Sequence, residues 1–263
     1  MPDKNKSTIK IKELPPIYWL NLENDTHRRE YMEKQFEYWE IKNHTRIVGY
    51  DGRIDDVCQH IVGAAPDQVT TSELGCCMSH LKAIKYFYEE TDDDYCLIFE
   101  DDVVLDLIKD WNFTWKDFFA KLPYNWDCVQ LTTICTGNIH VCIHHHFIND
   151  FSAAAYLITR HHASKIVKNH VRGKKFKLNN GIKPRPVSED TIFGSGLTYS
   201  ISILLYRLDL GSAIHPEHIE IYHKGSYDAL KNFWKNQGNE ITLDQLMELN
   251  PYLGRITEPV KKE

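Results

Sequence analysis

Residues 95–103 read Tyr-Cys-Leu-Ile-Phe-Glu-Asp-Asp-Val, an apolar run that leads directly into three acids. The run has the length and composition of a strand that is buried on both faces, as strands of parallel sheets are. Open α/β sheets bind their ligands at the carboxyl ends of the strands, which is where these acids fall. The stretch therefore predicts an α/β sheet with a ligand site at the end of this strand.

The three acids are Glu100, Asp101 and Asp102. Carboxylates at the end of a buried strand repel one another unless a cation neutralises them. Alternate residues of an extended chain point to the same side, so Glu100 and Asp102 can bind one ion while Asp101 points elsewhere. Oxygen ligands suit Mg²⁺ or Mn²⁺, which in turn suit a phosphate-bearing substrate. The alternative is a solvated acidic turn that binds no ion.

Length and composition limit the classes of function. The chain has 263 residues, 42% of them hydrophobic and 12% aromatic, enough for one large globular domain. Its net charge of −6 makes nucleic acid an improbable partner. The polar start of the chain predicts no signal peptide, and no apolar run is long enough to span a membrane. We therefore expect a cytoplasmic protein, or one of a secretory lumen if the chain is part of a longer one.

The seven cysteines are scattered, and several lie within apolar segments, where free thiols are common. This pattern favours a reducing compartment. Since no Cys-x-x-Cys pair occurs, a structural zinc site is not expected.

Strand and helix patterns alternate along the chain. Apolar strand patterns lie at residues 17–22, 46–48, 95–99, 126–131 and 153–158, and helical patterns follow Asp25 and Thr70 and cover 111–122, 163–170 and 188–193. The alternation predicts a three-layer α/β sandwich with a mostly parallel central sheet. We expect a flexible lead-in over 1–15, one domain over 16–228 and a small helical C-terminal tail over 229–263 that packs on it.

An ordered series of motifs resembles glycosyltransferase family 25, which includes bacterial lipooligosaccharide galactosyltransferases and procollagen galactosyltransferases. The family segment Glu-x-Gly-Cys-x-x-Ser-His-Leu stands at residues 73–81 with every fixed position filled. The family's first strand ends in Asn-Leu with an Arg six residues later, here Asn21-Leu22 and Arg28. The resemblance covers about residues 17–228 and implies a GT-A-like fold, a nucleotide-sugar donor and a divalent cation.

Further motifs follow in the family's order, and the resemblance gives them roles. The cation would bind Asp102 first and Glu100 second, with Asp101 nearer the ribose. By analogy with other metal-dependent GT-A enzymes, His223 would be a last ligand. The other positions expected to bind the donor are Asn21, Leu22, Arg28, Asp51, Gly52, Glu73, Ser79 and His80.

Several of these residues also have purely structural interpretations. Glu73 and Thr70 match a helix capping box. His80 would bond a ribose or phosphate oxygen, but a lone helical histidine is more often a satisfied core group. Arg28 could be a solvated helix residue. The three adjacent histidines at 144–146 are expected to form an exposed polar turn, because neighbouring strand residues cannot all face one ion.

Transfer with inversion needs a carboxylate that deprotonates the acceptor hydroxyl. Asp190 and Glu189 are the candidates, and the resemblance favours Asp190. Acids in a first helical turn are also ordinary partners of the helix dipole.

Together these features predict a metal-dependent enzyme that moves galactose or glucose from a UDP-sugar to a hydroxyl of a glycan or a hydroxylysine-type side chain. Mn²⁺ or Mg²⁺ is the expected cofactor. One alternative is a nucleotidyltransferase, but a glycine-rich phosphate loop is missing between Asn21 and Arg28. The other is a non-catalytic sugar- or protein-binding module, which would predict damage to the acidic triplet.

Overall fold

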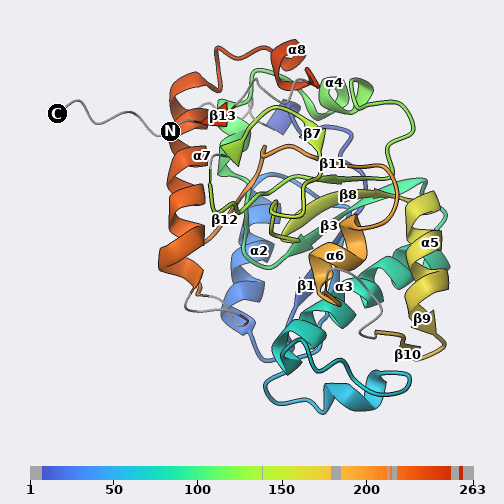
Figure 1. Cartoon of the computed structure of the whole chain (residues 1–263). Helices are drawn as coiled ribbons and strands as arrows, with labels where there is room; N and C mark the ends of the chain where they lie inside the picture. The colour runs from blue at the N-terminus through green and yellow to red at the C-terminus, as the bar shows by residue number, and fades with distance from the viewer. Residues whose placement is uncertain are drawn as a thin grey trace.

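The computed structural model describes residues 8–137, 139–178, 185–211, 214, 218–249 and 255–256. A seven-stranded sheet crosses it in the order β2-β1-β3-β8-β5-β11-β7 (Figure 1). The strands are β1 (Ile17–Asn21), β2 (His44–Val48), β3 (Tyr95–Glu100), β5 (Cys128–Gln130), β7 (His144–His145), β8 (Ala155–Thr159) and β11 (Thr198–Ser200).

Five of the seven strands point in one direction. β2, β1 and β3 pair in parallel, and so do β5 and β11. β8 is antiparallel to both β3 and β5, so those two strands share a direction, and β7 is antiparallel to β11. The mostly parallel central sheet is confirmed.

Helices cover both faces of the sheet and complete the three layers. One core holds side chains of α2 (Thr26–Tyr38), α4 (Trp115–Ala120), α7 (Lys224–Gln237) and α8 (Leu243–Leu246). The other holds side chains of α3 (Thr71–Glu90), α5 (Arg160–His170) and α6 (Ser188–Phe193). In Figure 1, α2 and α7 lie on the left and α5 lies on the right.

Alternation along the strands supplies both cores. Trp19 and Phe99 belong to the α2 and α7 side, whereas Leu20 and Ile98 belong to the α3 and α5 side. Successive strand residues point to opposite faces, so a strand in a middle layer must be apolar at every position. This is why the run at 95–99 carries no polar alternation.

Three small antiparallel pairs surround the main sheet. They are β4 (Val103–Val104) with β12 (Leu205–Tyr206), β9 (Val171–Arg172) with β10 (Lys175–Phe176), and β6 (Ile139–His140) with β13 (Arg255–Ile256). The first pair matters for the site, because it continues the chain after the acids. It brings Arg207 against them, and the Arg207 backbone N–H donates to the Asp102 carbonyl at 2.8 Å.

The two ends of the described chain pack onto the same core. Ile11 is buried, and the Lys10 carbonyl accepts from the Trp115 backbone N–H at 2.6 Å. Trp234 of α7 is fully buried, and its indole N–H donates to the Ser202 carbonyl at 2.8 Å. The expected boundary at 228/229 falls within α7, and the division into lead-in, domain and tail stays a prediction.

The histidines at 144–146 differ from expectation. His144 is buried in β7, where Nδ1 contacts the Cys142 carbonyl and Nε2 lies 3.1 Å from Asp150. The expected exposed turn is therefore wrong for His144, because both of its ring nitrogens have buried partners.

None of the helices in the described part of the chain is long and apolar enough to cross a membrane.

Candidate functional site

Three strand ends meet at one edge of the sheet. β1 and β3 are parallel with Leu20 opposite Glu100, and β1 and β2 are parallel with Asn21 opposite Val48. Because parallel strands end on the same side, Asn21 and the three acids must lie close together. The sheet therefore assembles the predicted site residues from segments about eighty positions apart.

Asp101 is held by protein groups on both of its oxygens. The Asn21 amide donates to Oδ2 at 2.7 Å, and the Arg28 Nε–H donates to Oδ1 at 2.6 Å. Asn21 is itself oriented by Arg46, whose Nε–H donates to the amide oxygen at 2.9 Å. The family's Asn-Leu and Arg positions thus fix the middle acid of the triplet.

Asp102 has one oxygen to spare. Its Oδ2 lies 3.1 Å from the Arg28 guanidinium, while Oδ1 is buried and has no hydrogen-bond partner among the described residues. Burial raises the pKa of Asp102 to about 7, Arg28 opposes the rise, and the charges of Glu100 and Asp101 add to it. An ionised Asp102 is therefore costly without a further positive charge.

The net negative charge of the acidic residues at the strand ends favours binding of a divalent cation. Arg28 forms ion pairs with Asp101 and Asp102 and also feels the charge of Glu100, so the ionised carboxylates outnumber this guanidinium. The acids hold the pKa of Arg28 above its ordinary value despite its burial. The spare oxygen of Asp102 supplies a hard ligand, the type that Mg²⁺ and Mn²⁺ prefer.

A small cavity of about 130 Å³ lies at the strand ends. Eight of the ten positions predicted to bind the donor line it, together with Asp102. They are Asn21, Leu22, Arg28, Asp51, Gly52, Ser79, Glu100 and Asp101.

The loop after β2 forms the far wall of this cavity by packing against α3. A Cβ on Gly52 would lie 1.9 Å from the Thr71 carbonyl oxygen, so the position requires glycine. Ser79 bridges loop and helix, because its hydroxyl donates to the Gly75 carbonyl at 2.7 Å and accepts from the Tyr50 N–H at 2.8 Å. Asp51 is turned to Arg53, whose hydrogen bond lowers the pKa of Asp51.

A larger cavity of about 530 Å³ adjoins the small one, and both are lined by Cys76, Glu100, Asp102 and Ile214. The larger cavity contains the predicted residues Glu73, Glu189, Asp190 and His223. Its volume is about four times that of the smaller cavity, and the acids lie between the two.

Glu189 and Asp190 enter the larger cavity from the first turn of α6. Asp190 Oδ2 accepts from the Arg185 backbone N–H at 2.8 Å, and Glu189 Oε1 accepts from the Ser152 N–H at 3.3 Å. Burial raises the pKa of both acids, and for Glu189 the charge of Glu100 adds to the rise. A raised pKa makes a carboxylate a better proton acceptor.

Glu73 forms the capping box that the sequence predicts. Its carboxylate accepts from the Thr70 N–H at 2.7 Å, and the Thr70 hydroxyl accepts from the Glu73 N–H at 3.2 Å. The helix cap therefore accounts for this acid, although the side chain also reaches the larger cavity.

His223 lies near Tyr206, whose hydroxyl donates to the His223 carbonyl at 2.8 Å.

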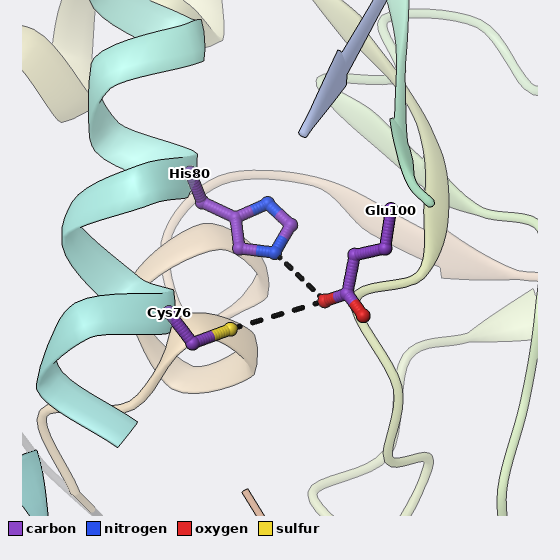
Figure 2. A group of neighbouring side chains, drawn as sticks. All are labelled: Cys76, His80 and Glu100. Atoms are coloured by element: carbon purple, nitrogen blue, oxygen red, sulfur yellow. Dashed lines mark hydrogen bonds and ion pairs between the residues drawn. The ribbon is translucent and has the colours of Figure 1, made fainter. Parts of the chain in front are cut away.

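His80 is fully buried and its ring lies beside the Glu100 carboxylate (Figure 2). Its Nε2 lies 3.0 Å from Glu100 Oε1, and its Nδ1 lies 3.1 Å from the Tyr156 hydroxyl. Both nitrogens have protein partners, and the contact with Nε2 orients Glu100, while the bond to ribose or phosphate stays a prediction. Burial raises the pKa of Glu100, but the hydrogen bond and charge of His80 and the charge of Arg28 outweigh it and lower that pKa.

Sequence reasoning missed the side chains that complete the two cavities. Cys76 points at Glu100 beside His80 (Figure 2), and its thiol lies 3.1 Å from the Ser188 hydroxyl. The family segment contains Cys76, and that was the available signal. Other lining residues of the larger cavity that carried no motif include Ser152, Tyr206, Arg207 and His218.

Comparisons with known proteins identify the family. The chain matches the family model described as glycosyltransferase family 25 (LPS biosynthesis protein) over residues 14–176, which is more than half of its length. No curated protein matches the chain. Among solved structures it resembles HddC from Yersinia pseudotuberculosis complexed with GMP-PN, at 12% identity and a TM-score of 0.36, over 74% of this chain and 93% of that one. So distant a likeness carries no argument about function. The family model does, and the chain belongs to glycosyltransferase family 25.

Proposed function

We propose that this glycosyltransferase moves a hexose, galactose or glucose, from a UDP-sugar to a hydroxyl of a glycan or a hydroxylysine-type side chain, with inversion. The observation that carries the proposal is the spare buried oxygen of Asp102, at the junction of two cavities. Family membership supports a nucleotide-sugar donor. The acidic edge supports a donor that arrives with a cation.

The smaller cavity is the proposed place for the nucleoside. Asn21, Leu22 and Arg28 end the first strand, and Asp51 and Gly52 face them from the loop after β2. Asp101 lies between these two sides and offers a carboxylate to ribose hydroxyls. In this assignment Ser79 acts indirectly, since it fixes the loop that closes the cavity.

The cation would be Mn²⁺ or Mg²⁺, held by Asp102 with Glu100 and His223 as further ligands. When bound, such an ion stabilises the charge that develops on the leaving diphosphate. All three side chains line the larger cavity. Arg28 acts alongside them, because it keeps the Asp102 carboxylate in place and limits the repulsion among the acids.

Asp190 is the proposed base, with Glu189 as the alternative. As the acceptor oxygen bonds to the anomeric carbon, its proton passes to the carboxylate, and the bond from that carbon to the phosphate oxygen breaks. UDP leaves with the electron pair of the broken bond. The Arg185 N–H donates to one Asp190 oxygen, and the Asp190 side chain lines the larger cavity. A positioned base of this kind contributes about 10²–10⁴ in rate.

Family membership favours sugar transfer over nucleotidyl transfer. An intact acidic triplet with an unused oxygen argues against a non-catalytic module, since such a module would gain stability by losing these charges.

The test is release of UDP from UDP-galactose and UDP-glucose, measured with Mn²⁺, with Mg²⁺ and with chelator. Acceptors are free saccharides and a hydroxylysine-containing peptide. We expect acceptor-stimulated release with one of the sugars, and none with chelator. Equal release from wild type and from Asp190→Asn and Asp102→Asn variants would contradict the assignment.

A further inference from the structure

A group of mixed metal-ligand type lies beside the proposed donor site and shares Glu100 with it. The Cys76 thiol, the His80 imidazole and the Glu100 carboxylate have ligand atoms that all lie within 4.8 Å of one another. Cys76 and His80 project from one side of α3 toward Glu100 at the end of β3 (Figure 2). Because they are four residues apart, one helical turn aligns them.

The separations within the group suit a tetrahedral ion. His80 Nε2 lies 3.0 Å and Cys76 Sγ lies 3.9 Å from Glu100 Oε1. Metal–ligand distances for zinc are ~2.3 Å to sulfur and ~2.0–2.1 Å to nitrogen or oxygen, which place tetrahedral ligands about 3.3–3.6 Å apart. The two distances to Glu100 Oε1 differ from that spacing by a few tenths of an ångström, and all three ligand atoms lie within 4.8 Å of one another.

Two of the ligands already have the outer partners that orient ligands in zinc sites. His80 Nδ1 lies 3.1 Å from the Tyr156 hydroxyl, which leaves Nε2 facing Glu100. Cys76 Sγ lies 3.1 Å from the Ser188 hydroxyl. Such outer contacts fix the histidine tautomer and ring orientation at metal sites. The group is thus pre-arranged on its protein side.

Its open side faces the larger cavity, which Cys76, Glu100, Ser188 and Glu189 all line. Sulfur and imidazole ligands favour zinc over Mg²⁺ or Mn²⁺, and three protein ligands with an open fourth position describe an accessible zinc site. The geometry points to a binding site for Zn²⁺, or its substitute Co²⁺, at Cys76, His80 and Glu100, a second ion position next to the one proposed at Asp102, with Glu100 contributing to both.

Binding of Zn²⁺ or Co²⁺ exchanges bonds to protons for bonds to the metal. The thiol proton of Cys76 and the proton held between His80 Nε2 and Glu100 Oε1 both pass to solvent as the bonds to the ion form. The contact between His80 Nε2 and Glu100 Oε1 gives way to one bond from each atom to the ion, while His80 keeps its Nδ1 proton for the Tyr156 oxygen. No atom changes oxidation state.

Cobalt absorption tests the site without nucleotide or acceptor, so its failure leaves the proposed transferase function unaffected. Co²⁺ is titrated into the full chain, and the thiolate-to-cobalt band and tetrahedral visible bands are recorded. Zn²⁺ is then added to displace it. The variants are Cys76→Ser and, as the matched control, Cys58→Ser, which removes an exposed free cysteine instead. Circular dichroism confirms that both variants fold.

Wild type and Cys58→Ser should bind one ion with the thiolate band, and Zn²⁺ should abolish it. Cys76→Ser should lose the band and bind Zn²⁺ at least about tenfold more weakly, since even outer-partner changes cost 10–100-fold. A band that survives in Cys76→Ser, or that disappears in Cys58→Ser, would overturn the assignment. So would the lack of a saturable band in wild type.

Discussion

Replacing Asp102 with asparagine should stabilise the metal-free protein. The wild-type side chain is mostly buried, with 16% of it exposed, and it lies close to two other acids and one guanidinium. Asparagine keeps the shape and an oxygen that can accept from Arg28, but it removes the charge. The substitution therefore relieves repulsion that the protein tolerates for the sake of its site.

The size of the effect follows from the pKa. A rise from 3.8 to about 7 corresponds to a ceiling of about 4 kcal/mol, at ~1.4 kcal/mol per pKa unit. Local relaxation and water entry reduce this ceiling, and we expect a gain of about 2 kcal/mol in the free energy of unfolding at pH 8. For a chain of this size, that raises the melting temperature by about 4 °C or more.

The pH dependence has a definite sign. The native pKa of Asp102 lies above the unfolded value, so ionisation favours the unfolded chain. The cost is absent below about pH 4 and grows as the pH rises to about 7. The advantage of Asp102→Asn should therefore be small at pH 4.5 and nearly complete at pH 8.

Urea unfolding of chelator-treated wild type and Asp102→Asn at several pH values measures this directly. Asp106→Asn is the control, because that residue is an exposed acid four positions further along the chain. If Asp102→Asn is less stable than wild type at pH 8, or if its advantage does not change with pH, the argument from charge repulsion is refuted.

Three further predictions concern the base, the loop and the C-terminal helix. Asp190→Asn should lower the rate of sugar transfer by a factor of about 10²–10⁴ and leave UDP affinity unchanged. If Glu189→Gln instead shows that loss and Asp190→Asn keeps the wild-type rate, Glu189 is the base. Gly52→Ala should weaken UDP binding, because the added Cβ would displace the loop from the Thr71 backbone. The control is Gly63→Ala, where an added Cβ meets no neighbouring atom. Because Gly63 has a positive φ that strains alanine, urea unfolding of both variants is measured as well. Trp234→Ala should cost about 3–5 kcal/mol in urea unfolding, against almost nothing for the exposed Lys235→Ala, and a small cost would mean that α7 is a detachable extension.

Local patterns were sufficient to predict most of the fold. The apolar run at 95–99 could only be a middle-layer strand, and the capping box at Thr70 fixed the start of α3. The helical pattern at 111–122 proved too long, because a second capping box starts α4 after Thr114. Local stop signals of this kind are easily hidden in an aromatic-rich stretch.

The sequence indicated most of the residues that line the smaller cavity, but not the contacts among them. Motif order brought Arg28 into the site, yet its ion pairs with Asp101 and Asp102 depend on β1 lying beside β3. Helical periodicity placed His80 on α3, but that its ring meets Glu100 follows only from how the helix crosses the sheet. The sequence did not single out Cys76 as a possible ligand, because only Cys-x-x-Cys pairs were considered. Its neighbours in the group are His80, one helical turn along α3, and Glu100 on another element.

The most direct test of the donor site is calorimetric titration of UDP into wild type, Asp102→Asn and the control Asp106→Asn, each with and without Mn²⁺. We predict micromolar binding by wild type and the control only when Mn²⁺ is present, and at least about tenfold weaker binding by Asp102→Asn, which loses a charged ligand. Because that variant should be the more stable protein, its lost affinity could not be attributed to unfolding. UDP binding by wild type that is equally strong without Mn²⁺, or that survives in Asp102→Asn, would contradict the account.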